Sequence, residues 1–237
     1  MFANIISNTN LQKSKLWSAN YFINSSAKDI STPYAMVCLA DLVTEQKTTM
    51  NPQQHTNDIF SYIGLENIQS NTRVLVNLKE CRGKEIKSNA KIFLTGDILY
   101  GRLRPALNKV LLVDVPIRNG ICSTEILVLR PNLKKVNPDF LAELLLSDLI
   151  LEKAVNLVRG ASLPRIQSSD LLALQIPLPP KDEQDELAIF IQQHRKSWFQ
   201  IRKLAEEIPK HIASQTMNFL LYSQKPKNHS LDFLEHP

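Results

Sequence analysis

Short apolar runs separated by turn residues dominate the first two thirds of the chain. Runs rich in Val, Ile and Leu alternate with Gly, Asn, Asp or Pro, a spacing typical of short strands. The runs cover residues 34–39, 74–78, 91–94, 98–100, 109–113 and 125–129. They predict a compact sheet with hairpins, whereas the polar segment 44–58 is predicted to be a loop.

Helical spacing replaces this pattern after Asn137. The residues Asn137-Pro138-Asp139 form a helix start signal, and apolar positions follow at helical spacing until Gly160 offers a stop. We expect two short helices, or one helix kinked at Ser147. Residues 176–180 (IPLPP) then contain three prolines, which predict an extended connector, exclude a central strand and mark the best domain boundary.

A heptad-like pattern begins after this connector. Acidic residues at 182–186 suit the N-terminus of a helix, and apolar residues then repeat in steps of four and three, as in a coiled-coil seam. The seam contains Leu187, Ile191, His194, Trp198, Ile201 and Ile208. Packing against the chain's own core is the alternative to a partner helix. Pro209 predicts a kink or break, because proline removes a helix hydrogen bond.

Together these elements predict an α+β fold, with a small sheet and short helices followed by a long coiled-coil-type helix. We expect a folded domain over residues 1–180, a helical arm over 181–223 and a flexible tail over 224–237. No segment approaches the roughly 18 uncharged apolar residues of a membrane span, and no signal peptide is visible. We therefore expect a cytoplasmic protein without membrane contact.

Composition is ordinary for a globular protein, with 43% hydrophobic and 22% charged residues. The three cysteines, Cys38, Cys81 and Cys122, form no Cys-x-x-Cys pair, so we expect buried reduced thiols and neither a zinc site nor a disulfide. The net charge of +5 is concentrated: residues 73–118 carry ten Lys or Arg against four acids, a local balance of +6. Such clustering suits a polyanion, although a solvated basic face is an equal alternative.

Five motifs follow one another in the order and spacing of a known family. They are YIGLENI (62–68), GDILYGRLRPALNK (96–109), GICSTEILVLRP (120–131), GASLPRI (160–166) and IPLPPKDEQ (176–184). Together they resemble the target-recognition domain and first conserved helix of type I restriction-modification specificity subunits. The resemblance spans roughly residues 60 to 210.

This resemblance implies a non-catalytic protein that binds double-stranded DNA and needs no cofactor or metal. Its implied partners are adenine-methylating subunits and a restriction subunit. Full-length members usually carry two recognition domains, whereas this chain holds one set of motifs. It therefore implies a half-subunit that pairs with a second copy, a fragment of a longer protein, or a one-domain relative; a symmetric pair favours a palindromic interrupted target.

Basic residues within and near these motifs are the candidate DNA contacts. Arg102 and Arg104 are expected on one strand face, where they could grip phosphate or read guanine, unless one pairs with a carboxylate such as Asp97. The remaining candidates are a mobile basic loop of Arg82, Lys84 and Lys87, a turn presenting Arg159 and Arg165, and Lys109. The alternatives are a solvated loop and a turn that only closes the domain, with Arg165 capping a helix carbonyl.

The polar loop supplies the candidates for base reading. Asn51, Gln53, Gln54 and His55 can pair with adenine edges, although such residues more often only form a loop. Cys122 to Glu125 have no histidine nearby, and the chain lacks a Gly-x-Gly cofactor loop and a Walker loop. We expect no catalytic residues. Two rivals stay open: an interaction protein with an incidental basic face, and the recognition fragment of a fused methyltransferase.

Overall fold

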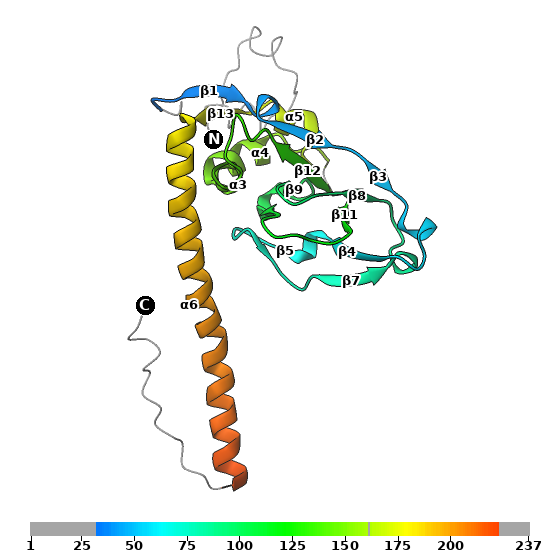
Figure 1. Ribbon diagram of the computed structural model, residues 1–237, viewed down its shortest axis with the longest axis vertical. Helices are drawn as coiled ribbons and strands as arrows, with labels where there is room; N and C mark the ends of the chain where they lie inside the picture. Colours follow the sequence, from blue (N-terminus) through cyan, green and yellow to red (C-terminus); the bar gives the residue numbers. More distant parts are fainter. Residues whose placement is uncertain (1–31, 161, 223–237) are drawn as a thin grey trace, which may run out of the picture. The chain divides into compact units, whose positions relative to one another are not determined.

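The structure is a computed structural model that describes residues 32–160 and 162–222 (Figure 1). The predicted tail over 224–237 lies outside the described residues. The chain divides into two compact units, residues 1–188 and 189–237. The division falls inside the long C-terminal helix, because the first turns of that helix are bonded to the first unit.

A four-stranded antiparallel sheet is the central layer of the first unit. Its order is β10 (Val110–Leu112), β9 (Ile98–Gly101), β12 (Ile126–Pro131) and β2 (Val43–Gln46). Both faces of this sheet are buried. Ile98 and Tyr100 belong to a core shared with helices, whereas Leu99 belongs to a second core shared with another sheet. The alternation follows from the period of two along a strand.

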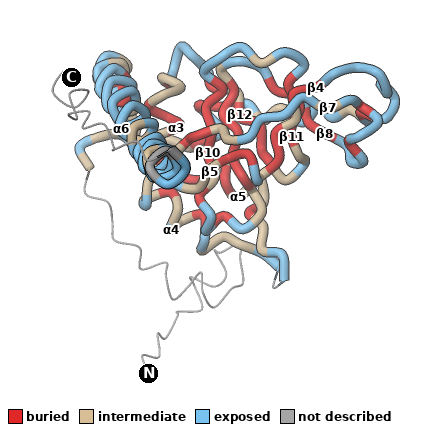
Figure 2. Tube along the Cα trace, turned by 90° about the horizontal axis from the view of Figure 1, so that it is seen from below, coloured by how far each residue is buried: buried red, intermediate tan, exposed pale blue. Residues whose placement is uncertain are grey.

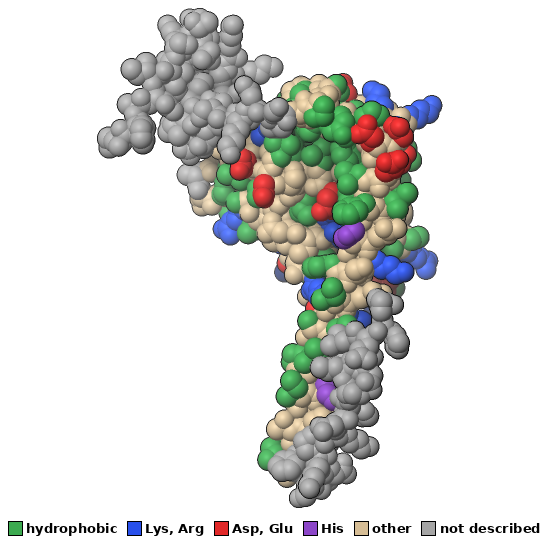
Figure 3. All heavy atoms as spheres, turned by 90° about the vertical axis from the view of Figure 1, so that its left-hand side faces the viewer, with side chains coloured by type: hydrophobic (Ala, Val, Ile, Leu, Met, Phe, Trp, Pro, Cys, Tyr) green, Lys and Arg blue, Asp and Glu red, His purple; other side chains and the backbone are tan. Residues whose placement is uncertain are grey.

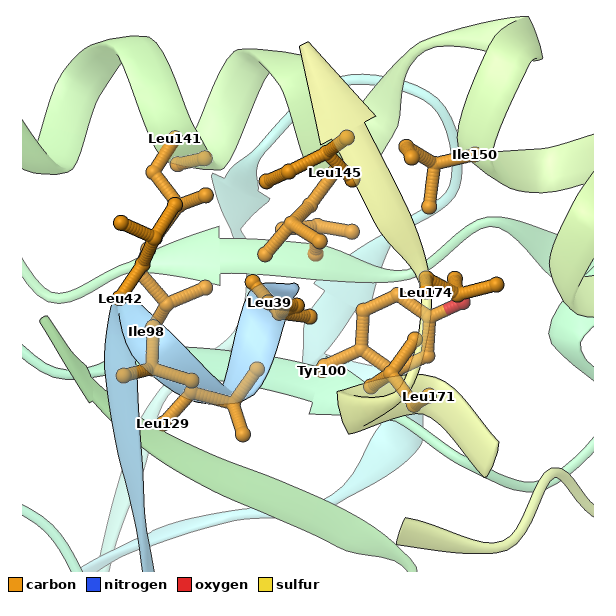
Figure 4. Close-up of a cluster of buried hydrophobic side chains, with 14 of the residues drawn as sticks. Leu39, Leu42, Ile98, Tyr100, Leu129, Leu141, Leu145, Ile150, Leu171 and Leu174 are labelled. Carbon is orange, nitrogen blue, oxygen red and sulfur yellow. The ribbon is translucent and has the colours of Figure 1, made fainter. Parts of the chain in front are cut away.

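The first of these cores lies against short helices (Figure 4). These are α3 (Pro138–Leu146), α4 (Asp148–Asn156) and α5 (Ser168–Leu172). Leu141 and Leu145 of α3 are fully buried there. The expectation of two short helices is confirmed, and Asn137 caps the first by accepting hydrogen bonds from the backbone of Asp139 and Phe140. The second helix ends at Asn156, before the predicted stop at Gly160.

A five-stranded mixed sheet covers the other face of the central sheet. Its order is β3 (Thr49–Met50), β8 (Ala90–Ile92), β11 (Gly120–Ser123), β4 (Ile59–Ile63) and β7 (Lys79–Arg82). Strands β4 and β11 are parallel, and the other pairs are antiparallel. Parallel strands begin at the same edge of a sheet, so the residues that precede β4 and β11 lie close together.

The described part of the first unit also contains two small sheets and five 3-10 turns. The sheets pair β1 (Ala35–Cys38) with β13 (Gln175–Leu178) and β5 (Ile68–Gln69) with β6 (Val74–Leu75). The turns are η1 (Leu39–Asp41), η2 (Pro52–Gln54), η3 (Leu65–Asn67), η4 (Gly83–Glu85) and η5 (Pro105–Leu107). Figure 2 shows the buried strands and the exposed turns at the end of the five-stranded sheet.

Several local predictions were wrong. The segment 44–58 is not one loop, because it contains most of β2 and all of β3, which are recruited by pairing with β12 and β8. The strand expected over 74–78 is only β6, and β7 was missed. The IPLPP connector is partly a strand: Pro177 pairs with Met36 in a two-stranded sheet, where both strands are edges and the missing N–H is tolerated.

The second unit contains most of helix α6 (Lys181–Tyr222), a single helix of 42 residues. The break predicted at Pro209 does not occur, since the helix runs through this residue. Pro209 is exposed, so its ring meets solvent rather than a packed neighbour. The free-energy cost of the missing hydrogen bond is therefore not offset by packing around the proline ring.

Side chains of the five sequence motifs connect distant segments of the first unit. Buried Asp97 of the 96–109 motif accepts hydrogen bonds from Arg130 of the 120–131 motif, at 2.8 and 2.9 Å. Gln184 of the last motif is also buried, and its side-chain oxygen accepts a hydrogen bond from the backbone of Asn137 at 2.9 Å. These residues hold segments that are distant in sequence, which is a structural reason for the motifs.

Candidate nucleic-acid interface

The polar segment 51–58 and the basic segment 82–87 lie against each other at one end of the five-stranded sheet. We call them the loop pair. The backbone N–H of Gly83 donates to Asp58 O at 3.0 Å, and that of Lys84 donates to Thr56 O at 3.4 Å. A Cβ atom on Gly83 would lie 2.1 Å from the carbonyl oxygen of His55, so only glycine permits this approach. Two groups predicted separately therefore form one surface.

The amide side chains of the loop pair face solvent. Asn51 caps η2, because its Oδ1 accepts a hydrogen bond from the backbone of Gln53 at 3.0 Å. Gln53 and Gln54 are exposed, and no hydrogen bond engages their side chains within the described residues. His55 is held more firmly, since its Nδ1 lies 3.3 Å from Asp58 Oδ2. Amides of this kind can pair with base edges.

The cations of the loop pair are exposed as well. Arg82, Lys84 and Lys87 form no ion pair with any residue that the structure describes. The segment expected as a loop includes the end of β7 and the turn η4. Arg82 ends strand β7, and its backbone N–H donates to Glu85 Oε2 at 3.2 Å, across the turn η4. Cations able to contact phosphate thus lie beside amides able to contact base edges, and both are exposed.

A second set of cations, the arginine group, lies where the 96–109 and 160–166 motifs meet. It consists of Arg102, Arg104, Arg159 and Arg165. The N–H of Arg104 donates to Pro164 O at 2.7 Å, and that of Ile166 donates to Arg102 O at 3.0 Å. The strand face expected for Arg102 and Arg104 was wrong: β9 ends at Gly101, and Arg104 has a left-handed backbone with φ of +49°.

Most of the arginine group is already paired. Arg165 grips both carboxylate oxygens of Glu125 at 2.6 to 3.0 Å, and this hydrogen bonding lowers the pKa of Glu125. Arg159 pairs with Asp170 at 2.9 Å. Arg102 donates to Gln167 Oε1 at 3.1 Å. Asp97, expected as a partner of the 102/104 pair, binds Arg130 instead. Arg104 is the exposed member without an ion pair in the described part of the chain.

Three other cations of the basic segment point inward. Lys109 Nζ donates to the carbonyls of Leu65 and Ile68 at 2.7 and 2.6 Å, and burial lowers its pKa. Lys91 Nζ donates to Ile126 O at 2.9 Å, and Arg73 is buried between carboxylates of α3. Because its ammonium group is bonded to the backbone around η3, Lys109 is not one of the proposed DNA contacts.

The sequence reasoning missed a hollow of about 310 Å³ beside the loop pair. It is lined by Asn57, Asp58, Ile59, Glu80, Arg118 and Asn119. Three short segments far apart in sequence supply these residues. They meet because β4 and β11 are parallel and β7 lies beside β4. The Arg-Asn-Gly turn before β11 was visible in the sequence, but its pairing partner was not.

The predicted seam of α6 is largely exposed (Figure 3). Ile201 is 66% exposed, and Leu187, Trp198 and Ile208 are exposed too, whereas Ile191 is buried. His194 stacks on Phe190 with ring centroids 3.9 Å apart. An exposed apolar stripe of this length is characteristic of a helix that packs against a partner.

Other site chemistry adds little. Within the described ranges, no cluster of three or more His, Cys, Asp or Glu side chains could hold a metal ion, and no helix is long and apolar enough to cross a membrane. All three cysteines are free, but only Cys122 is fully buried, and burial raises the pKa of its thiol to about 12. Cys38 and Cys81 are half-buried, unlike the expectation.

Comparisons with known proteins agree with the motifs. The family model described as "Type I restriction modification DNA specificity domain" matches residues 32–210. The type I restriction enzyme HindI specificity subunit of Haemophilus influenzae is 33% identical over 113 residues, which are 47% of this chain and 24% of that protein. The EcoDI specificity subunit of Escherichia coli is 27% identical over 155 residues, 65% of this chain and 32% of that protein.

Solved structures show the same architecture. The crystal structure of the HsdS subunit from Thermoanaerobacter tengcongensis matches with a TM-score of 0.62 and 27% identity, covering 84% of this chain and 51% of that chain. The type I restriction-modification S subunit from M. genitalium shares the fold, with a TM-score of 0.55 and 16% identity over 83% of this chain and 48% of that one. The chain thus spans about half of the solved chains and a third or less of the curated relatives.

Proposed function

Because the chain belongs to the family of type I restriction modification DNA specificity domains, we propose that it binds double-stranded DNA and reads one half of a bipartite target. It acts as a specificity component and carries no catalysis of its own. A methyltransferase subunit, which modifies adenine, and a restriction subunit where one is present would be delivered to that target. We propose that it acts in the cytoplasm, together with the DNA that it binds.

The loop pair is the observation that supports this function most directly. Arg82, Lys84 and Lys87 are exposed and form no ion pair with the residues that the structure describes, and each phosphate they neutralise releases counterions. Asn51 and Gln53 lie in the adjoining segment and offer amides for base edges. One end of a rigid sheet therefore presents both the positioning and the reading groups that a DNA contact requires.

The exposed seam of α6 supports a partner helix. A second copy of the chain, or another specificity half, would cover the apolar stripe in a coiled-coil packing. Residues 182–208 at about 1.5 Å per residue would then separate two recognition domains by some tens of ångströms. In such a pair, the length of the arm sets the spacing between half-sites.

Methylome sequencing tests this function. Cells that carry the complete restriction-modification system are compared with cells that lack only this chain. We expect a methylated adenine motif with two separated halves in the first cells and none in the second. An unchanged methylome would overturn the proposal.

Binding to that motif then tests the arginine group. Arg104→Ala removes an exposed guanidinium, whereas Arg102→Ala also breaks the contact with Gln167, so the single Arg104 variant is the cleaner experiment. We expect weaker binding with unchanged thermal stability. Unchanged affinity at physiological salt would remove Arg104 from the interface.

A further inference from the structure

The hollow beside the loop pair is lined by polar and charged residues and by one apolar residue, Ile59. Ile59 is 52% exposed, although it lies in a strand of the five-stranded sheet. Strand pairing places Arg82 opposite Ile59 and Glu80 opposite Ser61. Directly opposite residues point to the same face of a sheet, so Glu80, Ile59 and the cation Arg82 share one face.

Arg118 enters this hollow from the turn before β11. Its neighbour Asn119 has a left-handed backbone with φ of +49°, and Asn119 Nδ2 donates to Ile59 O at 3.0 Å. The N–H of Ser61 also donates to Asn119 O at 3.3 Å. These bonds fix the turn against β4, so the position of Arg118 is set by the sheet rather than by a loose loop.

Charges in the hollow are close but not paired with each other. Asp58, Glu80 and Arg118 all line it, yet in the part of the chain that the structure describes, Arg118 forms no ion pair with either carboxylate. All three residues are exposed. Carboxylates on a DNA-binding face repel phosphate, so their presence there needs a donor to compensate it. The exocyclic amine of cytosine is such a donor.

The combination of groups matches one base pair. In the major groove, guanine presents two acceptors, O6 and N7, which a guanidinium contacts with two hydrogen bonds. Its partner cytosine presents the N4 amine, which a carboxylate accepts.

We propose that this hollow reads a single G·C pair of the half-site, with Arg118 on guanine and Asp58 or Glu80 on cytosine. The proposal rests on the proposed function, because it requires that the chain bind DNA. In this proposal the hollow determines sequence specificity, whereas the cations of the loop pair bind the DNA backbone. The target of this chain then contains one G·C pair whose identity depends on Arg118.

The experiment uses the full chain in its complete restriction-modification system. The wild-type methylome defines the motif, and the same cells then express Arg118→Ala, Arg118→Lys, Glu80→Gln, Asp58→Asn or the control Lys134→Ala. Lys134 is an exposed cation outside the hollow. Purified complexes are also titrated with DNA in which each G·C pair of the half-site is replaced in turn.

We expect both Arg118 variants to lose discrimination at one G·C pair, by about tenfold, while other positions stay unchanged. Lysine keeps the charge but lacks the planar fork, so it should not rescue base choice. Glu80→Gln should weaken discrimination at the same pair if Glu80 is the acceptor, and Asp58→Asn should do so if Asp58 is. Lys134→Ala should leave the motif intact.

Three results would overturn the proposal. The first is an unaltered motif in both Arg118 variants. The second is a uniform loss of affinity in Arg118→Ala that lysine restores, which assigns Arg118 to a phosphate. The third is that the Arg118 variants no longer co-purify with the methyltransferase subunit, which assigns the hollow to a protein interface. Failure of the proposed function itself looks different, because the wild-type chain then yields no motif at all.

Discussion

Single cations of the basic segment have different fates that their spacing in the sequence does not reveal. Lys109 and Lys91 donate to backbone carbonyls inside the first unit. Arg82, Lys84 and Lys87 remain in solvent on the loop pair. The local charge of +6 therefore overstates the surface available to a polyanion. Only the exposed residues should contribute to the salt dependence of DNA binding.

We expect Arg82→Ala, Lys84→Ala and Lys87→Ala each to weaken binding to all DNA sequences alike. The plot of log affinity against log salt has a negative slope, and each lost phosphate contact should reduce its magnitude by about 0.9. Fluorescence anisotropy at several salt concentrations measures this slope, with Lys134→Ala as the matched charge control. Equal slopes in the variants and the wild type would show that these cations do not touch phosphate.

The Arg165–Glu125 pair should make stability depend on pH. The pKa of Glu125 is lowered in the folded state, mainly by its hydrogen bonds to Arg165. The pair thus stabilises the protein above the ordinary Glu pKa, and this contribution is lost as pH falls through the lowered value. We expect the free energy of unfolding of the wild type to exceed that of Glu125→Gln by about 1 kcal/mol near pH 7, and by less in acid. Urea unfolding at several pH values tests this; a gap that does not change with pH would contradict it.

At the scale of elements, the loop pair depends on one glycine. A Cβ atom at position 83 would lie 2.1 and 2.3 Å from the carbonyl oxygens of His55 and Pro52. We expect Gly83→Ala to separate η2 from η4, at a cost of about 1–3 kcal/mol, and to weaken DNA binding. Thermal unfolding and anisotropy measure the two effects. Ser88→Ala, at an exposed site of the same region, should change neither, and a stable, fully active Gly83→Ala would refute the packing argument.

The long helix α6 contains Pro209 and is continuous through it. Pro209 lacks the N–H for one helix hydrogen bond, and alanine would restore it. We expect Pro209→Ala to raise helix content and stabilise α6 by up to about 3 kcal/mol. Circular dichroism at increasing temperature checks this against Lys210→Ala. No gain in helix signal or melting temperature would mean that Pro209 does not destabilise α6.

For the whole molecule, the exposed apolar seam leads us to expect a second helix as its partner. Ile201 of the seam is 66% exposed, and Ile212, which continues the spacing four residues after Ile208, is 60% exposed. We expect the double variant Ile201→Asp plus Ile212→Asp to lower self-association, or association with another specificity half, by at least tenfold. Analytical ultracentrifugation measures the first and co-purification the second. The melting temperature of the first unit should not change, and unaltered association would exclude the seam as the interface.

Much of this organisation was readable from local patterns. The heptad repeat predicted α6, and the Asn-Pro-Asp signal predicted α3, because helix periodicity and capping are local properties. Strands that follow the period of two with Val, Ile and Leu, such as β9, were also found. The strands β2, β3 and β7 were missed, since their polar residues enter a sheet only through pairing with distant partners.

The sequence by itself determined the family, the α+β class and the long helix, because ordered motifs and periodicity are properties of consecutive residues. Only the tertiary structure decided which cations face inward, that the polar and basic segments form one loop pair, and that Arg118 shares a hollow with Asp58 and Glu80. The physical reason is strand pairing. The parallel pairing of β4 with β11 joins residues about 60 positions apart in the chain. Neither segment, taken alone, specifies which strand lies beside it.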